Sequence, residues 1–165
     1  MIGRLEITTV TGKNMKKTIF LVVCILCIGV FACAKESPEQ KTQTNAEKQT
    51  MNFIIDGKTY KASVNDNKTS QDIMKNLPLS LNYVRYAEHE YYAELPFKPV
   101  FDKERTSHIF AGHIYYWDGW NAFVINYKEC DISPYKVVHI GEIEDKSIVK
   151  YLETADKNIS VEVKK

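Results

Sequence analysis

The stretch Gly112–Tyr127, with the sequence GHIYYWDGWNAFVINY, places the tightest constraint on what this chain can fold into. Its two apolar, aromatic-rich runs are separated by Asp118-Gly119, and an Asp-Gly pair readily adopts the positive φ angles of a two-residue hairpin turn. Such a turn would place Trp117 directly opposite Trp120. The sequence therefore predicts an antiparallel hairpin as the central element of a β-rich domain.

Alternation along this hairpin predicts two different faces, because successive side chains of a strand point to opposite sides of a sheet. The two-residue turn pairs Ile114 with Phe123 and defines both faces. The first face is strongly apolar and contains Ile114, Phe123, Ile125 and Tyr127. The second face contains His113, Tyr115, Trp117, Trp120, Ala122 and Val124. A face with so much aromatic area is usually covered by a sheet, a helix or a ligand.

Short strand patterns continue on both sides of the hairpin. Runs bounded by turn residues predict further strands at 51–55, 58–64, 79–88, 90–95, 136–143 and 159–163. Helical spacing predicts two brief helices, one over 70–76 capped by Thr69 with Asp72, the other over 146–154 capped by Asp145. We expect a mainly β fold, a closed antiparallel barrel of about eight strands with two short helices, because closure removes exposed strand edges.

An N-terminal targeting pattern precedes this domain. Residues 15–32 begin with Met-Lys-Lys and continue with an apolar run that ends at Ala32, directly before Cys33. The run is shorter than the roughly 20 apolar residues of a spanning helix, which favours a signal peptide over an uncleaved anchor. A cysteine at this position resembles a bacterial lipoprotein signal, which implies cleavage before Cys33 and its acylation. Residues 1–14 do not fit the pattern and are a mis-assigned start or a short extension.

A polar tether follows the predicted lipidation site. Residues 33–50 contain no aromatic side chain and are dominated by Lys, Glu, Gln, Thr and Asn, a composition typical of flexible linkers. We expect the chain to be held at a membrane of the bacterial cell envelope through a lipid anchor on Cys33. Ala34-Lys35 gives no acidic retention signal, which favours the outer membrane. The formal net charge of +1 argues against a nucleic-acid partner.

The motifs of residues 51–165 occur in a recognisable order. They are Asn76-Leu-Pro-Leu79, Tyr92–Phe97, Ala111–Trp117, Asn121–Tyr127 and Ile140–Ile143. This order resembles the bacterial cyclophilin-like family, whose members are small single domains and sometimes lipoproteins. The resemblance covers essentially all of residues 51–165. It implies a cyclophilin-like closed antiparallel barrel of eight strands with helices closing its ends.

The resemblance does not by itself bring an activity. True cyclophilins place an arginine, in a Phe-His-Arg context, in a proline-binding groove, and such an arginine weakens the double-bond character of the prolyl amide. Only Arg85 and Arg105 lie in this domain, and neither has that context. Arg105, in the polar loop over 98–109, is the better candidate for a catalytic residue. The alternative is a solvated loop charge.

Four aromatic residues of the central hairpin are the candidate ligand-binding residues. They are Tyr115, Tyr116, Trp117 and Trp120. Aromatic side chains beside a turn can line a groove for a peptide or a small molecule. The alternative is that they pack against other elements of the fold.

The remaining chemistry-bearing residues predict no metal site and no cofactor. The histidines His89, His108, His113 and His139 are expected to be unconnected, because the domain has no zinc-ligand spacing. Cys130 is the one cysteine of the domain, so no intradomain disulfide can form. Its neighbours Glu129 and Asp131 are expected to raise its thiol pKa, which favours an incidental thiol over a nucleophile.

Three hypotheses for the function follow. The first is a membrane-tethered, cyclophilin-like module that binds a peptide or small ligand without catalysis. The alternative is a divergent peptidyl-prolyl isomerase that uses Arg105 and an aromatic pocket. The third is a structural or interaction module of an envelope assembly, which would present a flat apolar patch in place of a groove.

Overall fold

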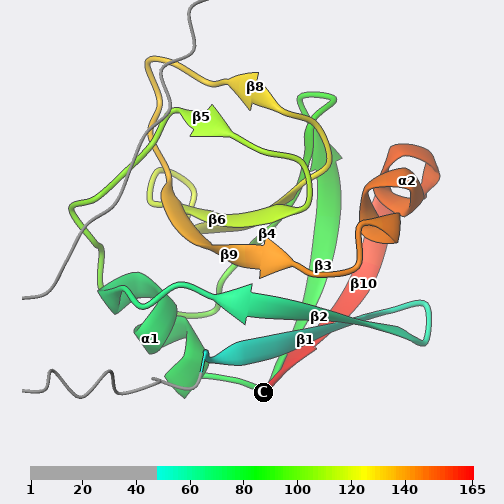
Figure 1. Ribbon diagram of the computed structural model, residues 1–165, viewed down its shortest axis with the longest axis horizontal. Coiled ribbons are helices and arrows are strands. Elements are labelled where there is room, and N and C mark those ends of the chain that lie inside the picture. Colours follow the sequence, from blue (N-terminus) through cyan, green and yellow to red (C-terminus); the bar gives the residue numbers. More distant parts are fainter. Residues whose placement is uncertain (1–47) are drawn as a thin grey trace, which may run out of the picture. The chain divides into compact units, whose positions relative to one another are not determined.

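Eight antiparallel strands close into a barrel in the order β1-β10-β3-β4-β7-β6-β9-β2 in the computed structural model, which describes residues 48–165 (Figure 1). The barrel strands are β1 (Thr50–Ile55), β2 (Lys58–Val64), β3 (Leu79–Tyr86), β4 (Glu90–Glu94), β6 (His113–Trp117), β7 (Ala122–Asn126), β9 (Val138–Ile143) and β10 (Asn158–Lys164). The other elements are α1 (Lys68–Lys75), α2 (Ser147–Thr154), β5 (His108–Ile109) and β8 (Cys130–Asp131). The predicted mainly β, closed antiparallel barrel with two helices is confirmed.

The predictions for the N-terminal segment lie outside the described residues. These predictions are the start at Met15, the signal peptide over 15–32, lipidation of Cys33 and all but the end of the tether. At the end of that tether, Thr50 already belongs to β1. Within residues 48–165, no helix is long and apolar enough to cross a membrane.

Alternating burial shows why these sequences form a barrel. In β1 every second residue, from Met51 through Phe53 to Ile55, is buried in the barrel interior. The two helices add apolar residues to the same core, among them Ile73 from α1 and Ile148 from α2. Each strand thus places one set of alternating side chains in a shared core, which gives the sheet a unique register.

The central hairpin has a longer turn than the sequence predicted. Trp117 pairs with Ala122, and Ile114 pairs with Ile125, so the turn contains four residues and the pairing is shifted by two relative to the expected one. The pairing of Trp117 with Trp120 is therefore wrong. The two predicted faces are nevertheless kept, because a shift of two residues returns every side chain to the same side of the sheet.

A small two-stranded sheet that the sequence did not predict covers the outer face of this hairpin. Strands β5 and β8 pair with each other and lie above β6 and β9 in Figure 1. Ile109 of β5 joins Tyr115 and Val124 in a second buried cluster outside the barrel. All five residues of β7 are consequently buried, since one face meets the barrel core and the other meets this cover.

The first helix is capped by a different residue from the one predicted. The side chain of Asn67, not Thr69, accepts the backbone N–H of Ser70 at 2.9 Å. Thr69 is fully buried, and its hydroxyl donates to the carbonyl of Val100 at 2.8 Å. Asp72 accepts the backbone N–H of Val100 at 2.8 Å. The predicted capping pair therefore fastens the loop after Lys98 onto α1 through Val100.

Candidate functional site

A groove of about 420 Å³ opens on the outer surface of the barrel, beside the turn of the β6–β7 hairpin. Its lining comes from the end of β3, the start of β4, the hairpin, β8 and the segment that follows β8. The lining residues are Tyr86, Ala87, His89, Glu90, Trp117, Trp120, Val124, Cys130, Asp131, Ile132, Ser133, Tyr135 and Val137. We refer to this site as the aromatic groove.

Four aromatic rings form the walls of the aromatic groove. The ring centroids of Trp117 and Trp120 lie 4.9 Å apart at an interplanar angle of 65°. Trp120 meets Tyr86 at 5.2 Å and 77°, and Trp117 meets Tyr135 at 5.6 Å and 73°. Tyr86, Trp120 and Tyr135 keep 46%, 45% and 59% of their surface exposed. Large aromatic rings with so much exposed surface are expected at a binding site, because burial normally stabilises them.

The charged residues of the groove lining are acidic. Burial raises the pKa of Glu90, while the nearby His89 lowers it, and the two side chains approach to 3.4 Å. Asp131 accepts the backbone N–H of Ser133 at 2.7 Å, and the hydrogen bonds from Ser133 lower its pKa. No lysine or arginine contributes to the described lining.

Cys130 also lines the groove, but its environment does not activate it. Burial is the main cause that raises the pKa of its thiol, followed by the charges of Glu90 and Asp131. The predicted rise of the thiol pKa is therefore confirmed. Of the two predicted acidic neighbours, Asp131 contributes to it, but Glu90 takes the place of Glu129. A thiol that stays protonated is a poor nucleophile.

The turn of the hairpin holds the groove tryptophans in place. Asn121 has a positive φ of 50°, and its side chain donates to the carbonyls of Leu95 and Phe97 at 2.8 and 2.9 Å. The same side chain accepts the hydroxyl of Tyr116 at 2.9 Å. A Cβ on Gly119 would lie 2.5 Å from the Trp117 ring, so glycine leaves room for that ring. Gly119 is thus required for packing, whereas the positive φ that the sequence predicted for Asp118-Gly119 occurs at Asn121 instead.

The four predicted ligand-binding residues fall into three different environments. Trp117 and Trp120 line the aromatic groove. Tyr116 is fully buried in the barrel core. Tyr115 is buried in the outer cluster and lines a second, more polar site. Tyr86, Tyr135 and Glu90 complete the groove from distant segments, which no local pattern around the hairpin could have indicated.

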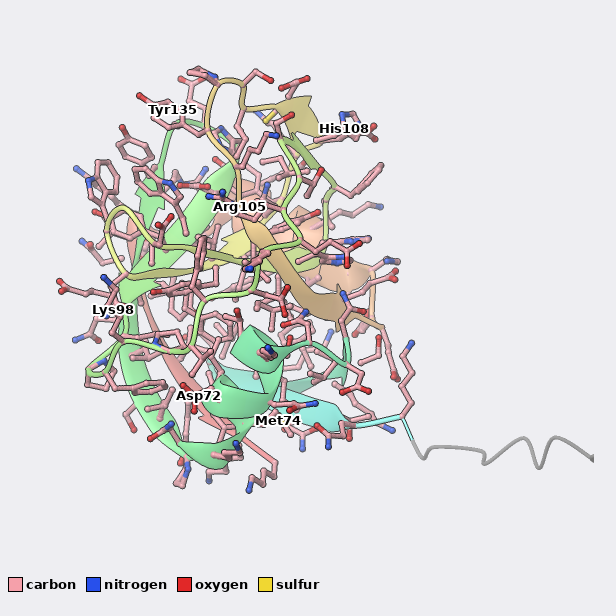
Figure 2. All side chains as sticks on the ribbon, turned by 90° about the vertical axis from the view of Figure 1, so that its left-hand side faces the viewer. Asp72, Met74, Lys98, Arg105, His108 and Tyr135 are labelled. Carbon is pink, nitrogen blue, oxygen red and sulfur yellow. The ribbon has the colours of Figure 1, made fainter. Side chains whose placement is uncertain are left out.

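The second site, here called the polar pocket, has a volume of about 450 Å³. It is lined by Asn65, Asp66, Asn67, Glu104, Arg105, Thr106, His108, Phe110, Tyr115 and His139. Arg105 is exposed, and its guanidinium lies 5.1 Å from the centre of the Phe101 ring. Figure 2 shows Arg105 well separated from Tyr135, so the candidate arginine and the aromatic groove belong to different sites.

Two of the histidines are connected, contrary to the prediction. His113 Nδ1 and His139 Nε2 lie 3.0 Å apart, and His139 Nε2 also lies 3.0 Å from the carbonyl oxygen of Gly141. That carbonyl can only accept, so His139 Nε2 carries a proton and His113 Nδ1 accepts it. Burial lowers the pKa of both imidazoles. No group of three or more metal-ligating side chains occurs in the described part of the chain.

The other arginine of the domain has a structural role. Arg85 Nη2 donates to the carbonyls of Leu152 and Ala155 at 2.8 and 2.7 Å, and Nη1 donates to Glu153 at 3.1 Å. These carbonyls end α2, where the last carbonyl groups of a helix lack partners within the helix. Arg85 therefore caps α2 and is not available to a ligand in the groove.

Comparisons with known proteins agree with this architecture. The family model described as the cyclophilin-like family matches residues 53–164. The solution structure of the hypothetical protein AF2241 from Archaeoglobus fulgidus is similar, with a TM-score of 0.56 and 16% identity over 71% of this chain and 94% of that chain. At this identity the likeness concerns the fold alone. No curated protein matches the sequence.

Proposed function

The chain belongs to the cyclophilin-like family, and from this premise we propose that its domain is a non-catalytic module that binds a peptide or small ligand. The observation that carries the proposal is the aromatic groove, in which Tyr86, Trp120 and Tyr135 remain largely exposed. Its volume of about 420 Å³ lies within the range of about 300–1,000 Å³ typical of small-ligand sites. A flat apolar patch, expected of a purely structural module, would lack this concave shape.

The distribution of the arginines supports binding over catalysis. A prolyl isomerase of the cyclophilin type would need a cation close to the bound prolyl amide. Arg105 lines the polar pocket, and Arg85 caps α2. The alternative, a divergent isomerase that uses Arg105, therefore requires a substrate bound in the polar pocket and not between the tryptophans.

Tryptophan fluorescence separates these functions. We expect a panel of short peptides, with and without proline, to contain sequences that change the emission of Trp117 and Trp120 in the full-length protein. We also expect no acceleration of prolyl isomerisation. Isomerase activity that disappears in Arg105→Ala would overturn the proposal and establish the alternative. A Lys103→Ala variant, altered in the same loop, is the matched control for that assay.

We further propose that the domain is tethered to the bacterial cell envelope through a lipid on Cys33, most naturally at the outer membrane. The support is the order of basic residues, apolar run and cysteine in residues 15–33. Metabolic labelling with a fatty-acid analogue in a bacterial host tests this tether. We expect the Cys130→Ala variant to be labelled like the unaltered chain and Cys33→Ala to remain unlabelled. Labelling of Cys33→Ala would contradict the proposal.

A further inference from the structure

We propose that the aromatic groove binds a small organic cation, a free alkylated ammonium compound. This inference rests on the proposed ligand-binding function of the same groove and adds the chemical class of its ligand. It follows from three properties of the lining, namely the arrangement of the aromatic rings, the sign of the charged groups and the burial of one carboxyl group.

The arrangement of the rings suits a cation. Trp117 meets Trp120 and Tyr135 at 65° and 73°, and Trp120 meets Tyr86 at 77°. Rings tilted this steeply against one another have faces that point in different directions, and all four residues line the same groove. The face of an aromatic ring is electrically negative, so it attracts a cation that lies within about 6 Å of its centre. Alkyl groups on the nitrogen would fill the apolar parts of the same walls.

The charged side chains select for a positive ligand. Glu90 and Asp131 both contribute to the lining, and no lysine or arginine does so among the described residues. His89 is the remaining lining residue that can carry positive charge, and its ring already contacts Glu90 at 3.4 Å. An anionic ligand would meet two carboxylates without a compensating cation of fixed charge.

Glu90 also lacks the solvation that an ionised carboxylate needs. Its side chain is only 18% exposed. A neutral apolar ligand in the groove would remove still more water from this carboxylate, which is unfavourable. A cationic ligand would instead supply the opposite charge. Burial already raises the pKa of Glu90, consistent with a carboxyl group that is short of favourable partners.

The size of the groove favours a free small molecule over a larger partner. A volume of about 420 Å³ is near the lower end of the range of about 300–1,000 Å³ for ligand sites. The same ammonium chemistry occurs in the head groups of choline lipids. Glycerophosphocholine, a soluble form of that head group, distinguishes a lipid ligand from a free ammonium compound. It carries a phosphate group in addition, which the acidic lining should repel.

The test compares choline with its neutral isostere, 3,3-dimethylbutan-1-ol, on the full-length protein in a maltoside detergent. Binding is measured by calorimetry and by tryptophan fluorescence. We expect choline to bind about tenfold more tightly than the isostere, and glycerophosphocholine to bind more weakly than choline. Glu90→Gln should reduce the preference for choline, because it weakens binding of the cation and removes the desolvation cost that the carboxylate imposes on the isostere. Glu129→Gln, an exposed acid outside the groove, is the matched control and should behave like the unaltered protein.

Several outcomes would overturn the inference. Equal binding of choline and the isostere would make the groove a site for neutral apolar ligands, and the proposed binding function would stand. Tighter binding of glycerophosphocholine would assign the site to a lipid head group. Binding of a neutral peptide without any binding of choline would also reject the cation and keep the binding function. If neither peptides nor these compounds bind, the proposed function itself fails.

Discussion

The two faces of the β6–β7 hairpin come from the same ten strand residues, yet they meet entirely different surroundings. On the inner face, Ile114, Tyr116 and Phe123 are each 0% exposed and pack in the barrel core. On the outer face, Tyr115 and Val124 are buried under the small β5–β8 sheet, whereas Trp117 opens into the aromatic groove. The difference shows how one strand pair can serve the fold on one side and leave an open aromatic groove on the other.

The contrast suggests a division of energetic roles that mutations can test. Inner-face residues should contribute mainly to the free energy of unfolding, because their side chains fill a closed interior. Outer-face residues near the turn should contribute mainly to ligand affinity. The predictions below are ordered by their expected effect on the free energy of unfolding.

The largest loss of stability is expected for Phe123→Ala. Phe123 is fully buried, and its ring centroid lies 5.9 Å from that of Phe53 on the opposite side of the barrel core. Removing a buried phenylalanine side chain costs about 3–5 kcal/mol, since it loses burial and leaves a cavity. Chemical denaturation measures the change. A loss below about 1 kcal/mol would mean that the inner face is far less tightly packed than the structure indicates.

A smaller loss of stability is expected for Asn121→Ala. Asn121 lies in the turn that connects the two strands of the hairpin. The Asn121 side chain makes hydrogen bonds to Leu95, Phe97 and Tyr116, and the residue has a φ of 50°. Losing partly buried hydrogen bonds and straining a positive φ should cost about 2–3 kcal/mol in unfolding free energy. Asn121→Gly is the matched control, because it removes the same side chain without the strain. Equal losses in both variants would assign the whole effect to the hydrogen bonds.

An acid-dependent loss of stability is expected at the edge of the outer face, where His113 and His139 meet. Burial is the main cause that lowers the pKa of each imidazole below its ordinary value of 6.5. The unfolded chain therefore binds protons below about pH 6.5 that the folded chain does not, and stability falls as the pH decreases. Glu142, whose pKa is lowered chiefly by Lys146, affects only more acidic conditions.

Denaturation midpoints between pH 8 and pH 5 measure this effect. The double variant His113→Asn, His139→Asn should show a flatter pH dependence than the unaltered protein. His108→Asn serves as the control, since His108 is exposed and pairs with Glu129 at 2.9 Å. A flatter profile in the control, or no pH dependence in the unaltered protein, would contradict the assignment to the buried pair.

The sequence predicted the two faces of the hairpin but not what covers the outer one. Alternation tells which side chains share a face, but it does not tell which residues pair across the two strands. A pairing shifted by two residues keeps every side chain on the same face, so the predicted faces were right although the predicted register was wrong. The longer turn depends on Asn121, whose bonds reach a separate segment at Leu95 and Phe97. Such a contact has no local signature in the sequence.

The candidate site was predictable only in part, for a similar reason. Trp117 and Trp120 lie beside a turn and are identified by local pattern. The cover over the outer face depends on β5 and β8, which contain two residues each and therefore show no periodicity. Tyr86 joins the groove because β4 pairs with both β3 and the hairpin strand β7, and Tyr135 joins it from the segment after β8. Only the three-dimensional structure shows that Arg105 lines the polar pocket and these rings line the aromatic groove.

The smallest effect on stability is expected for Trp120→Ala, the change that most sharply distinguishes the two faces. Trp120 contacts Tyr86, Tyr92 and Trp117, but 45% of its surface remains exposed in the folded protein. Unfolding exposes the rest of the ring, but removing a ring at the surface leaves no closed cavity, so the loss should be about 1–2 kcal/mol, smaller than for Asn121→Ala.

The same variant should lose most of its ligand affinity, because one wall of the aromatic groove is removed. Phe123→Ala, studied in parallel under conditions where it remains folded, should bind with nearly unchanged affinity, since Phe123 contributes to the core and not to the groove. A reversal of this pattern, with Trp120→Ala more destabilising than Phe123→Ala, would show that the exposed aromatic rings stabilise the barrel. The outer face would then be part of the fold, and its rings could no longer be explained by a ligand.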